Sequence, residues 1–212
     1  MKNSFFAGLL SLTLMISCQP GKQQLTNYVN PFLGTATLWE TKDLGYERHL
    51  KTRTWGAEVF PGSSVPNAMV QLSPVTQFRS GAGYQYEDTV IYGFSHTNKG
   101  HWNLLHLPIL PVTGNVSSDD YASKYSHTNE SAHPGYYQVF LERYGVNAEL
   151  TSTLRCAYHK YTFRPDDDKK VLVDITRTNN GVRDWSIQKV DDHTFSGNQD
   201  AEGNIRFYAV SN

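Results

Sequence analysis

The sequence contains very little cysteine: its 212 residues include two, Cys18 and Cys156. Cys18 ends an N-terminal segment with the features of an export signal, so the mature chain keeps one cysteine available for pairing and an internal disulfide is excluded. Cys156 stands in a strand-like run without a surrounding catalytic motif. We therefore expect Cys156 to be a small buried side chain rather than a nucleophile.

An excess of charge of either sign is also missing. The chain has 19 Lys and Arg against 20 Asp and Glu, a formal net charge of −1. No basic patch alternates with aromatic residues, which argues against nucleic acid as a partner. Aromatic residues make up 13%, including 13 Tyr and 4 Trp. Such rings stack on sugars, but tyrosine-rich β-sheets are also common in proteins that bind no ligand.

No apolar run is long enough to span a bilayer, which takes about 20 residues. The run at residues 5–16 follows a charged start and precedes a small residue, so residues 1–18 are predicted to be an export signal. Residues 15–18 (MISC) fit a bacterial lipobox, in which Cys18 becomes the lipidated N-terminus. The alternative is a plain secretory signal. Residues 19–27 are then a polar linker to a membrane anchor, in the periplasm or at the outer membrane.

A convincing amphipathic helix is absent as well, and short alternating segments take its place. The sequence therefore predicts an all-β antiparallel sandwich over residues 28–212. The end of the chain directly follows a strand-like run, which indicates a truncated reading frame or a fragment. Strands are expected at residues 137–141, 159–163, 171–175, 194–196 and 205–210, with turns at 142–145 and 165–168. After the first turn, the side chains of Val146, Ala148, Leu150 and Leu154 are expected to point inward.

Residues 61–97 are polar, glycine-rich and aromatic at once. Two apolar runs, 68–72 and 90–94, enclose a loop that holds Arg79, Gly81 and Gly83. The two glycines permit close backbone approach, as a ligand-lining loop requires. The alternative is a glycine-rich hairpin between two buried strands.

Three segments of the sequence resemble the N-terminal domain of glycoside hydrolase family 92, the bacterial exo-acting α-mannosidases. They are residues 28–35 (YVNPFLGT), residues 60–97 with the motifs MVQLSP and GFSHT, and residues 126–137 (SHTNESAHPGYY) continuing to residue 163. The segments follow the family's order and together span most of the mature chain.

The resemblance implies a β-sandwich of the galactose-mutarotase-like supersandwich type, normally followed by a C-terminal α-helical toroid that is absent here. It also implies a calcium-dependent, inverting α-mannosidase that acts on mannose-rich glycans. Inversion uses an acid and a base, which the family supplies from the helical domain. No catalytic residue is therefore assigned to this chain, and calcium is expected to bind mainly outside it.

By the same resemblance, the loops after Pro74 and Gly93 line one side of the sugar pocket. Family members usually read SHTHLSG where this chain reads SHTNKGH, and the tryptophan-bearing insert of some members is missing between residues 74 and 84. These departures indicate a divergent branch with an altered linkage preference. The candidate substrate-binding residues are Arg79, Tyr84, His96, Asn98 and Trp102.

Each candidate has a structural alternative. Arg79 is either a donor to sugar hydroxyls or an exposed loop arginine. Tyr84 and Tyr86 are expected to share one strand face, with one of them in a pocket at most. His96 is a ligand contact or a structural histidine, and Trp102 is a sugar platform or part of a domain interface.

A metal site within the chain is not expected. His101 and His106 lack a third ligand, and residues 166–168 (DDD) lack the spacing of a calcium loop and are predicted to be a solvated turn. Two other classes of protein stay open at this point: a carbohydrate-binding sandwich lipoprotein without a catalytic partner, and a structural lipoprotein without a ligand.

Overall fold

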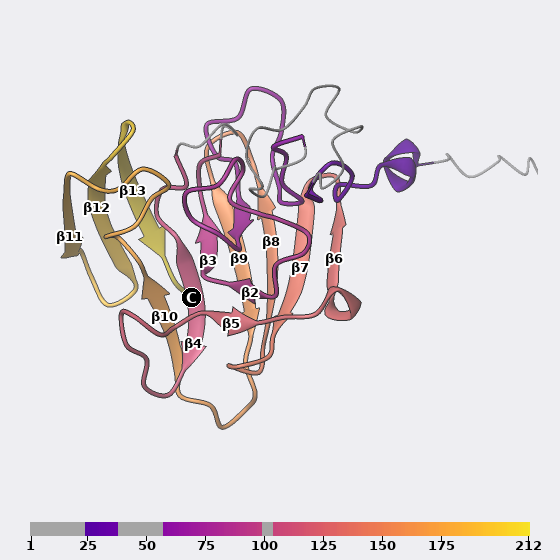
Figure 1. The fold of residues 1–212 in the computed structure, drawn as a ribbon. Helices are drawn as coiled ribbons and strands as arrows, with labels where there is room; N and C mark the ends of the chain where they lie inside the picture. Colours follow the sequence, from indigo (N-terminus) through magenta and orange to yellow (C-terminus); the bar gives the residue numbers. More distant parts are fainter. Residues whose placement is uncertain (1–23, 38–56, 99–103) are drawn as a thin grey trace, which may run out of the picture.

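The computed structural model describes residues 24–37, 57–98 and 104–212, and in these ranges the fold is all-β (Figure 1). The helical segments found there are two short 3-10 helices, Leu25–Tyr28 and His127–Asn129. Neither is long and apolar enough to cross a membrane. The strands are β1 Ser73–Val75, β2 Val90–Ile91, β3 Gly93–Ser95, β4 Ile109–Thr113, β5 Ser123–Lys124, β6 Glu130–His133, β7 Tyr136–Leu141, β8 Val146–Ser152, β9 Ala157–Thr162, β10 Lys169–Val173, β11 Asp184–Lys189, β12 Thr194–Asp200 and β13 Asn204–Val210.

Two four-stranded sheets form the sandwich. One has the order β6-β7-β8-β9 and the other β1-β3-β4-β10, and neighbouring strands in both are antiparallel. The antiparallel β-sandwich that the sequence predicts is confirmed. A third sheet, β11-β12-β13, lies at the β10 end of the molecule, while β6 marks the opposite end (Figure 1).

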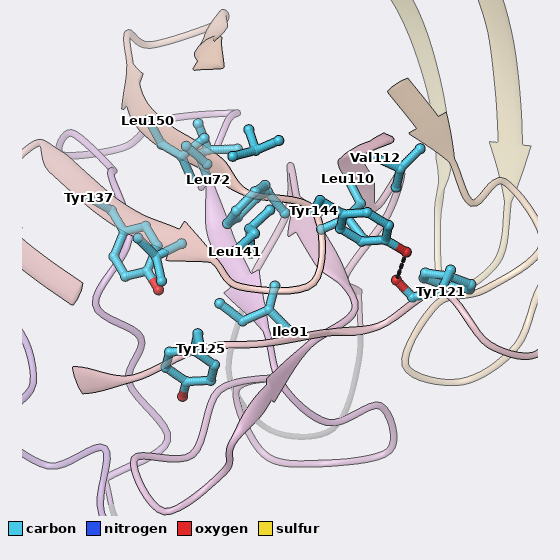
Figure 2. Packing of buried hydrophobic residues seen from close by; sticks show 14 of the residues in the cluster. Leu72, Ile91, Leu110, Val112, Tyr121, Tyr125, Tyr137, Leu141, Tyr144 and Leu150 are labelled. Atoms are coloured by element: carbon cyan, nitrogen blue, oxygen red, sulfur yellow. Dashed lines mark hydrogen bonds between the residues drawn. The ribbon is translucent and has the colours of Figure 1, made fainter. Parts of the chain in front are cut away.

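The core lies between the two four-stranded sheets. Figure 2 shows Leu110 and Val112 of β4 near Leu141 of β7, with Ile91 and Leu72 beside them. The Tyr144 hydroxyl donates to the Tyr121 carbonyl oxygen at 2.6 Å, which satisfies a polar group inside this apolar cluster (Figure 2). Full burial of each large apolar side chain contributes about 1.5–3 kcal/mol to folding.

The alternating segments fold as their period indicates. In β7, Tyr137, Val139 and Leu141 are buried, and between them lie partly exposed residues. The turn at residues 142–145 leads into β8, whose Val146, Ala148 and Leu150 pack on the same core. The turn at residues 165–168 is also present, and its aspartates are largely solvated.

Two expectations about the connection after β8 are wrong. The strand ends at Ser152, so Leu154 leaves the inward series and is 56% exposed. Cys156 is exposed rather than buried. It belongs to a tight turn in which the Thr153 amide donates to the Cys156 carbonyl oxygen at 2.8 Å, and this turn lifts both side chains off the sheet.

Residues 84–86 also differ from expectation, because they lie in a loop that leads into a turn and not in a strand. Tyr84 and Tyr86 therefore do not share a strand face: Tyr84 is completely buried and Tyr86 is 38% exposed. The strand before this loop is β1, just after the apolar run at 68–72, and it pairs with β3. Strands β4, β5, β6 and β11 were not expected from the sequence.

Candidate functional site

Among the described residues, five of the six non-glycine positions with left-handed backbone gather in three segments, and the sixth is Asn67. Glu58, Arg79 and three leucines have left-handed backbone: φ is 52° at Glu58 and 56° at Arg79, and 68°, 62° and 50° at Leu104, Leu105 and Leu107. This conformation is costly for residues other than glycine, especially leucine, and such strain concentrates at functional sites. The strained positions therefore mark the part of the described chain to search for a site.

The three strained segments lie against one another. A Cβ atom placed on Gly81 would come within 2.8 Å of the Glu58 side chain. One placed on Gly83 would come within 2.7 Å of the Leu105 side chain. We call this region, made of Glu58 and residues 77–83, 96–98 and 104–107, the loop cluster.

Asn179, which lies outside the cluster, holds the loop at residues 77–83 by hydrogen bonds. Its side-chain nitrogen donates to the Ser80 carbonyl oxygen at 2.7 Å, and its side-chain oxygen accepts from the Ser80 amide at 3.2 Å. Its own amide donates to the Leu104 carbonyl oxygen at 2.9 Å. Asn179 is 1% exposed, so one buried residue joins two of the strained segments. The loop cluster is thus pre-organised by internal hydrogen bonds.

Asn98 holds the same loop through a second set of hydrogen bonds. Its side-chain nitrogen donates to the Ala82 carbonyl oxygen at 2.6 Å, and its backbone amide donates to the Gln71 side-chain oxygen at 3.1 Å. Asn98 is 1% exposed. The loop after Pro74 and the segment after Gly93, which the family resemblance connects with a sugar pocket, are therefore in direct contact.

His96 and His159 connect the two sheets. The Nδ1 atom of His96 lies 2.8 Å from the Leu107 carbonyl oxygen, and the two Nε2 atoms lie 3.0 Å apart. Because a carbonyl only accepts, His96 carries its proton on Nδ1 and accepts at Nε2 from His159. His159 Nδ1 then accepts from the Tyr161 hydroxyl at 2.7 Å.

Both histidines are held in their neutral forms. Burial lowers the pKa of His96 to about 4. Burial, and then the proximity of His96, lower the pKa of His159 well below its usual value. His106, next along the cluster, also has its pKa lowered by burial, and its Nδ1 lies 2.8 Å from the Thr97 hydroxyl. Neutral histidines suit hydrogen bonding in this packed region better than charge interactions.

The predicted site residues occupy different environments. Arg79 is exposed at the tip of the loop, whereas His96 and Asn98 hold the cluster from within. Tyr84 is buried beneath it, and its hydroxyl donates to the Glu130 carboxylate at 3.0 Å. Trp102 and Cys18 lie outside the described residues. Arg79, His96 and Asn98 are thus brought together, and their contact with substrate stays a prediction.

Three residues that support the site were not predicted from the sequence. Asn179 stands in a segment without a motif, and Glu130 lies in the family segment 126–137 but had no role assigned to it; the roles of both depend on contacts with distant residues. His159 belongs to the alternating segment of β9, but its partnership with His96 spans 63 positions. Only the resemblance of both histidine segments to the same family could have suggested that they meet.

In residues 24–37, 57–98 and 104–212, no three His, Cys, Asp or Glu side chains gather at the spacing of metal ligands.

The fold and the loop cluster define an antiparallel β-sandwich domain with a tightly hydrogen-bonded, largely buried loop cluster, from which Arg79 is exposed to solvent. The family model described as "Glycosyl hydrolase family 92 N-terminal domain" matches residues 28–211, and the chain belongs to this family. The family assignment made from sequence is confirmed. No match was found among curated protein sequences.

Several solved structures resemble the chain. The family GH92 α-mannosidase BT3965 from Bacteroides thetaiotaomicron, in complex with mannoimidazole, is 30% identical with a TM-score of 0.69, and the match covers 82% of this chain and 23% of that one. The family GH92 inverting mannosidase BT2199 from the same organism is 25% identical with a TM-score of 0.65, and the match covers 83% and 22%. The family GH92 glycosyl hydrolase ccman5, at 24% identity and a TM-score of 0.66, shows the shared fold, and the match covers 25% of that chain. The chain thus spans about a quarter of the length of these relatives.

Proposed function

We propose that this chain is the N-terminal domain of an inverting α-mannosidase that removes terminal α-mannose from mannose-rich glycans. Family membership and the likeness to two bacterial mannosidases support this assignment. In this proposal the domain performs no bond cleavage. It forms one wall of the sugar pocket.

The loop cluster is the observation that carries the proposal. A wall that recognises a sugar gains affinity and specificity when its donors are fixed before binding, because less ordering entropy is lost. Asn98 and Asn179 fix the loop below Arg79 by buried hydrogen bonds. The exposed guanidinium of Arg79 has five N–H donors in a planar fork, which can bind two neighbouring hydroxyl groups of a sugar.

The acid and the base lie outside this chain in the proposed enzyme. Inversion requires two carboxyl groups about 6.5–9.5 Å apart on opposite sides of the glycosidic bond. Calcium dependence belongs to the same proposal, with ligands supplied from beyond the described residues. Bound calcium would orient sugar hydroxyls, and Arg79 would hold hydroxyls on the opposite wall.

Export and membrane attachment complete the proposal. The apolar run at residues 5–16 and the lipobox around Cys18 support export followed by lipidation, with the domain held in the periplasm or at the outer membrane. This location suits an enzyme whose substrates are external glycans.

The test is mannose release from a synthetic α-mannoside by the polypeptide expressed from the complete gene, including any coding sequence beyond Asn212. We expect release that stops when a calcium chelator is added and returns when calcium is restored. A stable, folded product that releases no mannose in any of these conditions would contradict the assignment.

A further inference from the structure

A second polar surface lies away from the loop cluster, on the outer face of β6, β7 and β8. There the structure has an open hollow of about 530 Å³, a size within the range of about 300–1,000 Å³ typical of small-molecule sites. None of its lining residues belongs to the loop cluster. The hollow is lined by Thr128, Asn129, Glu130, Ser131, Gln138, Phe140 and Asn147.

The strand register explains why four of these side chains, those of Ser131, Gln138, Phe140 and Asn147, share one face. Gln138 is directly opposite Ser131 on β6, and Phe140 is directly opposite Asn147 on β8. The alternate residues of β7, such as Val139, point into the core. The hollow is therefore built on a regular sheet, which places side chains more precisely than a loop does.

Hydrogen bonds fix the orientation of two amides in the hollow. The Gln138 side-chain nitrogen donates to the Asn147 side-chain oxygen at 3.0 Å. The Tyr136 hydroxyl lies 3.0 Å from the Gln138 side-chain oxygen and 2.8 Å from a Glu149 carboxylate oxygen. The single hydrogen of the Tyr136 hydroxyl goes to the closer, charged Glu149 oxygen, so the Gln138 oxygen stays available as an acceptor. The second hydrogen of the Gln138 amide and the Asn147 amide nitrogen are left as donors toward a ligand.

The lining offers no net charge to a ligand. Its one ionisable member, Glu130, has a side chain that is 1% exposed. The carboxylate accepts from the Tyr84 hydroxyl at 3.0 Å and the Tyr137 hydroxyl at 2.6 Å, and His127 Nδ1 lies 2.6 Å away. These three protein groups take up the hydrogen-bonding positions of the Glu130 carboxylate. Phosphates, carboxylates and cations therefore find no counter-charge among the lining residues.

Amide and hydroxyl groups beside one aromatic ring match a neutral ligand with many hydroxyls. The amides and Ser131 bind hydroxyl groups, and the half-buried ring of Phe140 provides an apolar surface for the C–H face of a sugar ring. We propose that this hollow is a second carbohydrate-binding site, which holds a neutral segment of a glycan chain at a distance from the pocket wall. The inference does not depend on the proposed catalytic function.

Affinity electrophoresis tests this inference. The protein is run through gels that contain neutral α-mannan and, separately, anionic polygalacturonate. We expect mannan to retard the protein and polygalacturonate to leave its mobility unchanged. Asn147→Leu should weaken the retardation by mannan about tenfold, because it removes a fixed amide and adds an apolar branch.

Ser131→Trp is the second variant, because Ser131 is exposed and the larger side chain fills the hollow without disturbing the core. It should also weaken retardation about tenfold. Gln188→Ala, at an exposed position on β11 outside both the hollow and the loop cluster, is the control and should bind mannan as the unmodified protein does. No retardation of the unmodified protein, or equal retardation of Ser131→Trp, would overturn the proposal. Arg79→Ala is compared as well: if it abolished retardation while Asn147→Leu and Ser131→Trp kept it, mannan binding would belong to the pocket wall and the proposal would be overturned.

Discussion

At the scale of the residue, His96 and His159 link the two sheets through a single chain of hydrogen bonds. The Leu107 carbonyl oxygen fixes the tautomer of His96, and His96 fixes that of His159. The Tyr161 hydroxyl, which donates to His159, ends this chain of hydrogen bonds. A proton added to His96 would place two donors opposite each other at the Nε2 contact, and a proton added to His159 would occupy Nδ1, which now accepts from the Tyr161 hydroxyl. The pair therefore stabilises the fold only while both rings are neutral.

This arrangement predicts a loss of stability in acid. The folded-state pKa is about 4 for His96 and lies well below the usual value for His159, while unfolded histidine has a pKa of about 6.5. As the pH falls from about 6.5 toward 4, the unfolded chain takes up protons that the folded chain refuses, so the free energy of unfolding decreases. Each histidine contributes a slope of up to about 1.4 kcal/mol per pH unit.

Denaturant unfolding at a series of pH values checks this prediction. Near pH 5, His159→Gln should show a slope lower than that of the unmodified protein by up to about 1.4 kcal/mol per pH unit. His133→Gln, at an exposed histidine, is the matched control, and its slope near pH 5 should stay much closer to that of the unmodified protein. Equal slopes for the unmodified protein and His159→Gln would show that burial does not keep this histidine neutral.

At the scale of the element, the loop at residues 77–83 depends on close packing at Gly83. This residue has φ of +80°, and an added Cβ would meet the Leu105 side chain at 2.7 Å. Leu105 cannot move aside easily, since it is 1% exposed and itself has a left-handed backbone. The loop and the leucine segment therefore hold each other in place.

Gly83→Ala and Gly114→Ala separate packing from backbone strain. Gly114 also has a left-handed φ, of +67°, but an added Cβ would meet nothing within 4 Å. Both substitutions carry the backbone cost of about 1–2 kcal/mol. Gly83→Ala should be more destabilising by about 1–3 kcal/mol in denaturant unfolding, because it also overpacks the cluster. Equal losses would mean that the loop cluster is not tightly packed.

Strands and loops differ in how much of them the sequence predicts. The period of two in β7 and β8 identifies Tyr137, Val139 and Ala148 as core residues, because local alternation alone decides which face is buried. Tyr84 lacks such a local signal. Its position depends on Glu130, 46 residues away, so propensity and pattern could not place it.

The same reasoning applies to the edges of the fold. Strand β11 is exposed along its whole length and therefore lacks the apolar alternation that reveals a half-buried strand. Cys156 is apolar in type, yet a tight local turn decides its exposure. The resemblance to family 92 predicts that the loops after Pro74 and Gly93, which carry Arg79, His96 and Asn98, lie beside one pocket. Asn179 carries no such motif, and its contacts with Ser80 and Leu104 connect it to the loop cluster.

At the scale of the whole molecule, the sandwich acts as a support for a surface assembled from distant parts of the chain. Asn179 and Ser80, which meet at the loop cluster, are separated by 99 positions. The chain spans about a quarter of the length of its mannosidase relatives. We therefore propose the activity for a longer polypeptide, in which this domain would contribute recognition of the sugar.

The most direct test of that contribution is kcat/KM for mannose release by the polypeptide expressed from the complete gene, with Arg79→Ala compared with Arg206→Ala. Both arginines are exposed, but Arg206 lies on β13, away from the loop cluster. A charge-assisted hydrogen bond contributes about 1.5–3 kcal/mol, so Arg79→Ala should lower kcat/KM about 10- to 100-fold, while Arg206→Ala leaves it unchanged. Equal kcat/KM values for Arg79→Ala and the unmodified enzyme would contradict the account of the loop cluster as a wall of the sugar pocket.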